Sequence, residues 1–303
     1  MINHLNIDNN KAELTKNGYC VLENRFSSEI LRRAQMAFNE IYQLAMNGEY
    51  NYVRVYDDYS DNKNIAGIES PFHKKILRQE IIDLIEDSKI IDIAQEIIQD
   101  EVILELSRYH LTRNFSHLGI WHRDEDINQL KYETLQLNIF LFDEIGIQVI
   151  DGSHQVKNDS IDFLLQKNPY STIENSKWLK TRAGDILIFD PAILHRGISA
   201  KPRANMHFRF RKKHSKKYAI QPYEYLDQYK LSEKVKYQIL YNLNYIKLPE
   251  PYSHPYSIKL KCIRLLRRLI HNLIIFLPLN SKFYRYFLAW PNLTLRKLFK
   301  IEI

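Results

Sequence analysis

The pattern that most limits the possible folds lies after Asp100, where the chain changes to short runs rich in β-branched and aromatic residues. These runs are EVILELSRYHLTR, TLQLNIFLF, IQVIDG, GDILIFD, ILHRGIS and NMHFRFRKK. Turn-like residues separate most of them, and we predict no long helices between them. Strands in this arrangement predict an antiparallel sandwich or barrel rather than a parallel α/β sheet.

Helical periodicity precedes and follows this β region. Residues 13–49 predict a helix, a short strand and a second helix, for which Ser27 or Ser28 is a suitable N-cap. A further helical block spans residues 72–98. From about Gln221 the chain is helical again, and prolines interrupt the last segments. We therefore expect a mixed α+β fold in two parts, a core over residues 1–220 and a basic helical extension over residues 221–303.

Composition is that of a globular protein, with 45% hydrophobic and 26% charged residues among 303. The two cysteines, Cys20 and Cys262, are far apart, so no disulfide framework is expected and a reducing compartment is favoured. The N-terminal segment lacks the basic and apolar regions of a signal peptide, and no apolar run reaches about 18 residues. These features predict a cytoplasmic protein.

Positive charge is concentrated near the C-terminus. Residues 251–303 hold ten Lys or Arg and one acid, so this segment has a charge of +9. Because the whole chain has a net charge of +7, the remaining residues carry about −2. A near-neutral body gives no indication of nucleic-acid binding. The tail mixes these cations with Leu, Ile, Phe, Tyr and Trp, a composition typical of helices at an anionic bilayer surface, here the inner face of the cytoplasmic membrane. Packing of the same helices on the protein's own core or on a second subunit is an equally good interpretation.

The segment GIWHRDEDI, residues 119–127, is polar yet lies between two predicted strands. In a strand, His122 and Asp124 point to the same side and Arg123 points away. His195, 71 residues after Asp124 and at the end of another predicted strand, is the best third ligand. Two histidines and a carboxylate on a β scaffold form a facial triad with open coordination positions, which suits non-haem Fe(II). Each motif alone is also explained by a solvated charge run or a structural histidine.

Several segments together resemble the phytanoyl-CoA dioxygenase family. They are LTKNGYCVLENRFSSEIL, WHRDED, GIQVIDGSHQVK, RAGDILIFDPAILHRG and KPRANMHFRFR, which cover roughly residues 11–213 in the family's order. The resemblance implies a double-stranded β-helix (jelly-roll) core that uses Fe(II), 2-oxoglutarate as cosubstrate and O2. It also implies His122, Asp124 and His195 as iron ligands. Arg203 matches the arginine that binds the far carboxylate of 2-oxoglutarate, although it follows His195 by eight residues, a slightly shorter gap than is usual in the family.

Other positions are weaker candidates. Arg209 is the fallback for Arg203, because it lies six residues on and therefore on the same strand face. Gln136 and Asn138 alternate with apolar residues and either contact the cosubstrate or form cross-strand hydrogen bonds. The Ser153–His154 turn is expected to be architectural, with His154 not a ligand. Tyr109 and Arg113 are candidates on the substrate side.

The resemblance implies a 2-oxoglutarate-dependent dioxygenase that hydroxylates a C–H bond of a small-molecule, sugar or lipid-linked substrate. If the tail binds membrane, a peripheral hydroxylase of a glycolipid or lipopolysaccharide sugar is a second interpretation. A non-enzymatic β-helix binding module is the alternative from another class. The intact set of His122, Asp124, His195 and Arg203 argues against that module.

Overall fold

A computed structural model describes residues 7–55, 65–112, 121–127, 132–156, 159–167, 171–197, 203–213 and 220–245. The chain divides into two compact units, Met1–Leu248 and Pro249–Ile303. The second unit lies outside the described residues, and so do the basic helices predicted there. No helix in the described ranges is long and apolar enough to cross a membrane.

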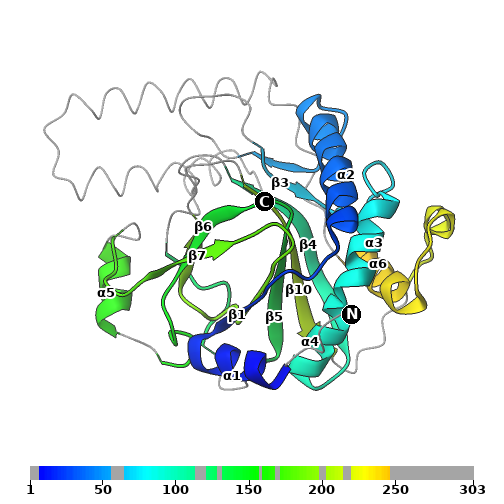
Figure 1. Ribbon diagram of the computed structural model, residues 1–303. Helices are drawn as coiled ribbons and strands as arrows, with labels where there is room; N and C mark the ends of the chain where they lie inside the picture. The colour runs from blue at the N-terminus through cyan, green and yellow to red at the C-terminus, as the bar shows by residue number, and fades with distance from the viewer. Residues whose placement is uncertain are drawn as a thin grey trace, which may run out of the picture. The chain divides into compact units, whose positions relative to one another are not determined.

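The first unit is built on two antiparallel sheets (Figure 1). The larger has the strand order β1-β8-β5-β10-β4-β3-β2 and the smaller has the order β7-β6-β9. The strands are β1 Tyr19–Leu22, β2 Val53–Val55, β3 Ile65–Glu69, β4 Val102–Thr112, β5 Thr134–Phe140, β6 Glu144–Val149, β7 Lys177–Thr181, β8 Ile186–Phe189, β9 His195–Gly197 and β10 Arg203–Lys212. The chain passes from one sheet to the other between β5 and β6, β7 and β8, β8 and β9, and β9 and β10. The predicted antiparallel β core is confirmed.

The helices lie mainly before and after the strands of this core. They are α1 Ile7–Asn17, α2 Ser28–Met46, α3 Gln79–Ser88, α4 Ile90–Ile98, α5 Asp159–Lys167, the 3-10 helix η2 Glu224–Gln228 and α6 Glu233–Tyr245. Ser27 is the N-cap of α2, where its hydroxyl accepts a hydrogen bond from the Ile30 N–H at 3.3 Å. The helical block predicted over 72–98 comprises two helices, the first of which starts at Gln79 rather than at Phe72. Lys89 adopts a left-handed conformation with φ 54°, which ends α3 and starts α4 in a new direction.

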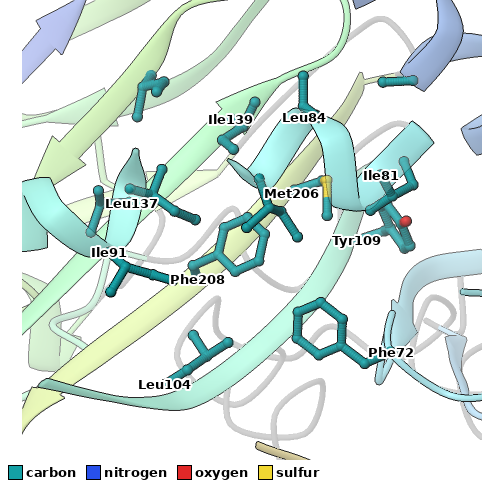
Figure 2. Packing of buried hydrophobic residues seen from close by; sticks show 14 of the residues in the cluster. Phe72, Ile81, Leu84, Ile91, Leu104, Tyr109, Leu137, Ile139, Met206 and Phe208 are labelled. Carbon is teal, nitrogen blue, oxygen red and sulfur yellow. The ribbon is translucent and has the colours of Figure 1, made fainter. Parts of the chain in front are cut away.

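Residue alternation in β5 and β10 separates an apolar face from a polar one. The apolar face carries Leu137, Ile139, Met206 and Phe208, which pack with Leu84 of α3 and other core residues (Figure 2). Burial of such side chains stabilises the fold by about 1.5–3 kcal/mol each. The opposite face of the large sheet packs on the small sheet through a second cluster that includes Phe140, Phe189 and Val149. Polar side chains on that same face therefore lie between the sheets.

Residues 221–245, the described part of the predicted extension, pack on the core. In α6, the Gln238 side chain accepts from the Leu104 N–H at 2.7 Å and donates to the Val102 carbonyl at 2.8 Å. The Ser107 hydroxyl donates a hydrogen bond to Oδ1 of the buried Asn242 at 2.8 Å. These bonds join α6 to β4, so α6 belongs to the first compact unit, which runs to Leu248.

Candidate metal centre

The segment that contains His122 lies beside the segment that contains His195. The His122 N–H donates to the His195 carbonyl at 2.9 Å, and the His195 N–H donates to the His122 carbonyl at 3.0 Å. The Asp124 N–H donates to the Pro191 carbonyl at 2.9 Å. This short antiparallel bridge extends the small sheet at β9, so backbone hydrogen bonds bring together two segments that are distant in sequence.

Three potential ligand atoms meet at this bridge. One atom each from His122, Asp124 and His195 lies within 4.8 Å of the other two. The two imidazole rings are 4.4 Å apart between centroids, and His122 Nε2 lies 3.6 Å from Asp124 Oδ1. Two imidazole nitrogens and a carboxylate oxygen at this spacing fit a divalent transition metal, with further coordination positions open to small ligands.

His195 is prepared to act as a metal ligand. Its Nδ1 lies 2.9 Å from the Ile193 carbonyl, which can only accept, so Nδ1 carries the proton and Nε2 has a free lone pair. Burial of the ring lowers the pKa of His195 to about 4. The imidazole is therefore neutral near pH 7, the form that binds metal.

Asp124 is held in its charged form. Burial by itself would raise the pKa of Asp124, but its electrostatic interactions with His195 and then Arg209 outweigh burial, and the pKa is lowered. An Arg209 Nη forms an ion pair with Asp124 Oδ2 and donates to Gln136 Oε1 at 2.9 Å. Arg209 and Gln136 face each other across β10 and β5, so both residues predicted as weaker candidates lie at this site.

The remaining predicted residues fall in different places. Arg203 is the first residue of β10, opposite Thr112, and its side chain is outside what the structure describes. Arg113 also lies outside the described residues. Tyr109 is fully buried on the apolar face, with its ring 5.4 Å from that of Phe38, so it does not face the metal centre.

The turn with Ser153 and His154 supports the distal ligand segment. The Ser153 hydroxyl accepts from the Leu194 N–H at 2.8 Å, directly before His195. His154 Nε2 lies 3.2 Å from the Thr15 carbonyl of α1, and His154 is not among the three clustered ligands. Its ring packs so closely on Gly18 that a Cβ at Gly18 would lie 2.5 Å from His154 Nδ1.

Further functional candidates escaped the sequence analysis. Arg123 points away from the ligands, as alternation predicts, but it is half-buried and donates to the carbonyls of Ser153 and Ala192. Glu125 pairs with Arg211 of β10 at 2.7 Å. His207 and Asn205 are buried on the polar face of β10. The alternation in RANMHFRFR signals His207 and Asn205, whereas the partners of Arg123 and Glu125 have no local signal.

Several buried polar atoms on this face have no hydrogen-bond partner among the described residues. They are both ring nitrogens of His207, Asn138 Oδ1, Asn205 Oδ1 and Arg209 Nε. In β10 and β5 these residues share the face of Arg209 and Gln136. Unpaired buried polar atoms are costly, so a polar ligand bound between the sheets fits this surface.

Fold and site together define a candidate mononuclear metal centre of the two-histidine, one-carboxylate class on an antiparallel β scaffold. The chain belongs to the phytanoyl-CoA dioxygenase family, whose model matches residues 14–204, so the predicted family is confirmed. The family uses Fe(II), 2-oxoglutarate and O2. No curated protein matches the sequence.

Three of the solved structures with similar folds are compared with this chain in sequence identity, TM-score and coverage. AviO1 from Streptomyces viridochromogenes Tue57 is 14% identical at a TM-score of 0.55, covering 69% of this chain and 96% of its own. EctD from S. alaskensis, solved with 2-oxoglutarate and 5-hydroxyectoine, is 20% identical at a TM-score of 0.50, and the match covers 67% of this chain and 74% of EctD. SnoK, a non-heme alpha ketoglutarate dependent carbocyclase from nogalamycin biosynthesis, is 16% identical at a TM-score of 0.50, and the match covers 67% of this chain and 83% of SnoK. At these identities the likeness concerns the fold.

Proposed function

We propose that this chain is an Fe(II)- and 2-oxoglutarate-dependent oxygenase and that its two sheets form a double-stranded β-helix. The observation that carries the proposal is the convergence of His122, Asp124 and His195 within 4.8 Å in a member of the phytanoyl-CoA dioxygenase family. We further propose hydroxylation of a C–H bond in a small molecule as the reaction. The 5-hydroxyectoine in the EctD structure supports a substrate of this size.

In this proposal His122, Asp124 and His195 hold Fe(II). Iron, 2-oxoglutarate and O2 together supply a two-electron oxidation of the substrate, coupled to decarboxylation of 2-oxoglutarate to succinate. The protein positions these groups. The Ile193 carbonyl orients the His195 ring, and Arg209 with Gln136 orients Asp124 and keeps it ionised.

Arg203 remains the proposed partner of the far 2-oxoglutarate carboxylate. The alternative, Arg209, already has one Nη nitrogen engaged by Asp124 and Gln136, which favours a role in orienting the ligand. Arg209 Nε, Gln136 and the neighbouring unpaired polar atoms can still contact the cosubstrate. A bidentate guanidinium–carboxylate pair suits Arg203, and lysine would not reproduce its geometry.

The direct test is anaerobic addition of Fe(II) and 2-oxoglutarate to the metal-free protein. We expect a weak visible charge-transfer band, and succinate after O2 is admitted. The His195→Ala variant loses the band, whereas His154→Ala, which removes a buried histidine outside the ligand cluster, keeps it. Absence of a band and of succinate in the unmodified protein would refute the enzyme and favour a β-helix binding module.

We also propose, as a second candidate, that the enzyme acts at a membrane on a glycolipid or lipopolysaccharide sugar. The observation in its favour is the +9 charge and apolar-aromatic composition of residues 251–303. Flotation with vesicles that contain anionic lipid tests it. The full chain should float and a chain that ends after Leu248 should not, whereas equal flotation of both would exclude the tail as the anchor.

A further inference from the structure

Arg123 stands between the two ligands that lie closest in sequence. Because His122 and Asp124 point toward the metal centre, Arg123 points to the other side of the same segment. There its guanidinium donates to two backbone carbonyls, those of Ser153 and Ala192. Arg123 is half-buried, so water competes less for these carbonyls than it would at an exposed site.

Both acceptors belong to segments that hold His195. Ala192 lies three residues before His195, and the next backbone group, the Ile193 carbonyl, orients the His195 ring. The Ser153 hydroxyl accepts from the Leu194 N–H at 2.8 Å, and the Ile150 N–H donates to the Leu194 carbonyl at 3.1 Å. One guanidinium therefore joins the His122–Asp124 segment to the turn before His195 and to the turn that supports it.

The opposite end of the ligand segment is attached by an ion pair. Glu125, one residue after Asp124, pairs with Arg211 of β10 at 2.7 Å. Both side chains are 29% exposed, so water screens this ion pair. Each attachment uses one arginine side chain, and the two attachments lie two residues apart in the ligand segment, at Arg123 and at Glu125. Arg211 is therefore a matched comparison for Arg123.

We propose that Arg123 is a positioning residue that holds the two halves of the ligand set in register before metal binds. This inference rests on the proposed function, since it assumes that His122, Asp124 and His195 bind the metal. Without Arg123 the ligand segment keeps its backbone bonds to His195 and Pro191, but the Ala192 and Ser153 carbonyls lose their guanidinium donor. Groups that orient the ligands of a metal typically contribute 10–100-fold to metal affinity.

The test is titration of the metal-free protein with Co(II), followed by visible absorption and calorimetry. We expect Arg123→Met to bind Co(II) 10–100-fold more weakly than the unmodified protein. Arg123→Lys keeps a donor that reaches one carbonyl and should recover part of the affinity. Arg211→Met, which removes the same charge from the other attachment, should change affinity by less than about threefold. Equal affinity for Arg123→Met and the unmodified protein would overturn the inference.

Amide hydrogen exchange of the metal-free protein gives a second readout that needs no metal. Arg123→Met should speed exchange at Leu194 and His195, and unchanged protection there would also overturn the inference. If the unmodified protein does not bind Co(II), the proposed function fails, while exchange still judges the structural role of Arg123. Should Arg123→Met not fold, Arg123→Lys decides the question, because it removes the guanidinium and keeps the positive charge. It should bind Co(II) more weakly than the unmodified protein and speed exchange at Leu194, and equal affinity with unchanged exchange would overturn the inference.

Discussion

Replacement of Arg209 by methionine tests the electrostatic arrangement of the metal centre. Methionine retains an unbranched apolar stem and removes the guanidinium that pairs with Asp124 and donates to Gln136. The Asp124 carboxylate, with its side chain 22% exposed, then loses its ion-pair partner, and the buried Gln136 Oε1 loses the Arg209 donor. Both groups must be accommodated by a site that was built around a cation.

The magnitude follows from burial. Opposite charges about 4 Å apart interact by about 4 kcal/mol at an effective dielectric constant of about 20. Breaking a buried pair by removal of one partner costs about 3–5 kcal/mol, and breaking an exposed pair costs about 0–1 kcal/mol. Side chains 16% and 22% exposed lie between these limits and nearer the buried one. We expect the free energy of unfolding of the metal-free protein to fall by about 2–3 kcal/mol.

Urea unfolding of the metal-free protein at pH 7.5 measures this loss, because a bound metal ion would itself neutralise Asp124. Arg211→Met is the control, since Arg211 lies two residues on in β10 but pairs with the more exposed Glu105 and Glu125. Its loss should stay below about 1 kcal/mol. Equal losses for the two variants, or no loss for Arg209→Met, would refute the pairing of Arg209 with Asp124.

Three further predictions concern the fold around the site. Gly18→Ala should lower the free energy of unfolding in urea by about 2 kcal/mol or more, because φ is +87° and the new Cβ would lie 2.5 Å from His154 Nδ1. Gly152→Ala is the control, since φ there is +69° but the nearest atom is 3.5 Å away, and it should lose only about 1 kcal/mol. Equal losses for the two variants would contradict the close approach of His154 to Gly18. Phe208→Ala should cost about 3–5 kcal/mol at an unchanged m-value, and a cost below 1 kcal/mol would place that side chain outside the core. Burial, with Arg108 and Arg209 nearby, holds the pKa of His207 well below 6.5 in the folded protein. The unfolded chain therefore binds more protons at this residue than the folded protein does, so the free energy of unfolding decreases as pH falls below about 6.5. The stability of His207→Phe relative to the unmodified protein should therefore improve by up to about 1.4 kcal/mol per pH unit below 6.5, and a difference that does not change with pH would show that His207 is not buried as a neutral ring.

The β region was predictable because its signal is local. Alternation in TLQLNIF and NMHFRFR assigns Leu137 and Phe208 to one face and Gln136 and Arg209 to the other, and the structure confirms both faces. The helical block over residues 72–98 was predicted less well. A left-handed turn at Lys89, a residue with no intrinsic preference for positive φ, divides it into two helices.

The metal centre illustrates where local signals stop. Residue types and i, i+2 spacing suffice to nominate His122 and Asp124 as a pair on one side of a strand. Which distant histidine joins them depends on how β9 pairs with the ligand segment, and this pairing is set by the crossover of the chain between two sheets. The charge run after the motif, unexplained by its own sequence, is in part an ion pair between Glu125 and Arg211 across 86 positions.

The sequence by itself therefore determined the antiparallel β core, the polar and apolar faces of its strands and the residue types able to bind a metal. Each depends on neighbours within a few positions, where backbone periodicity leaves few choices. Only the tertiary structure decided that Arg209 rather than solvent neutralises Asp124, and that Arg123 binds the two turns that hold His195. Those partners are set by strand register and by the packing of one sheet on the other, which no local pattern in the chain specifies.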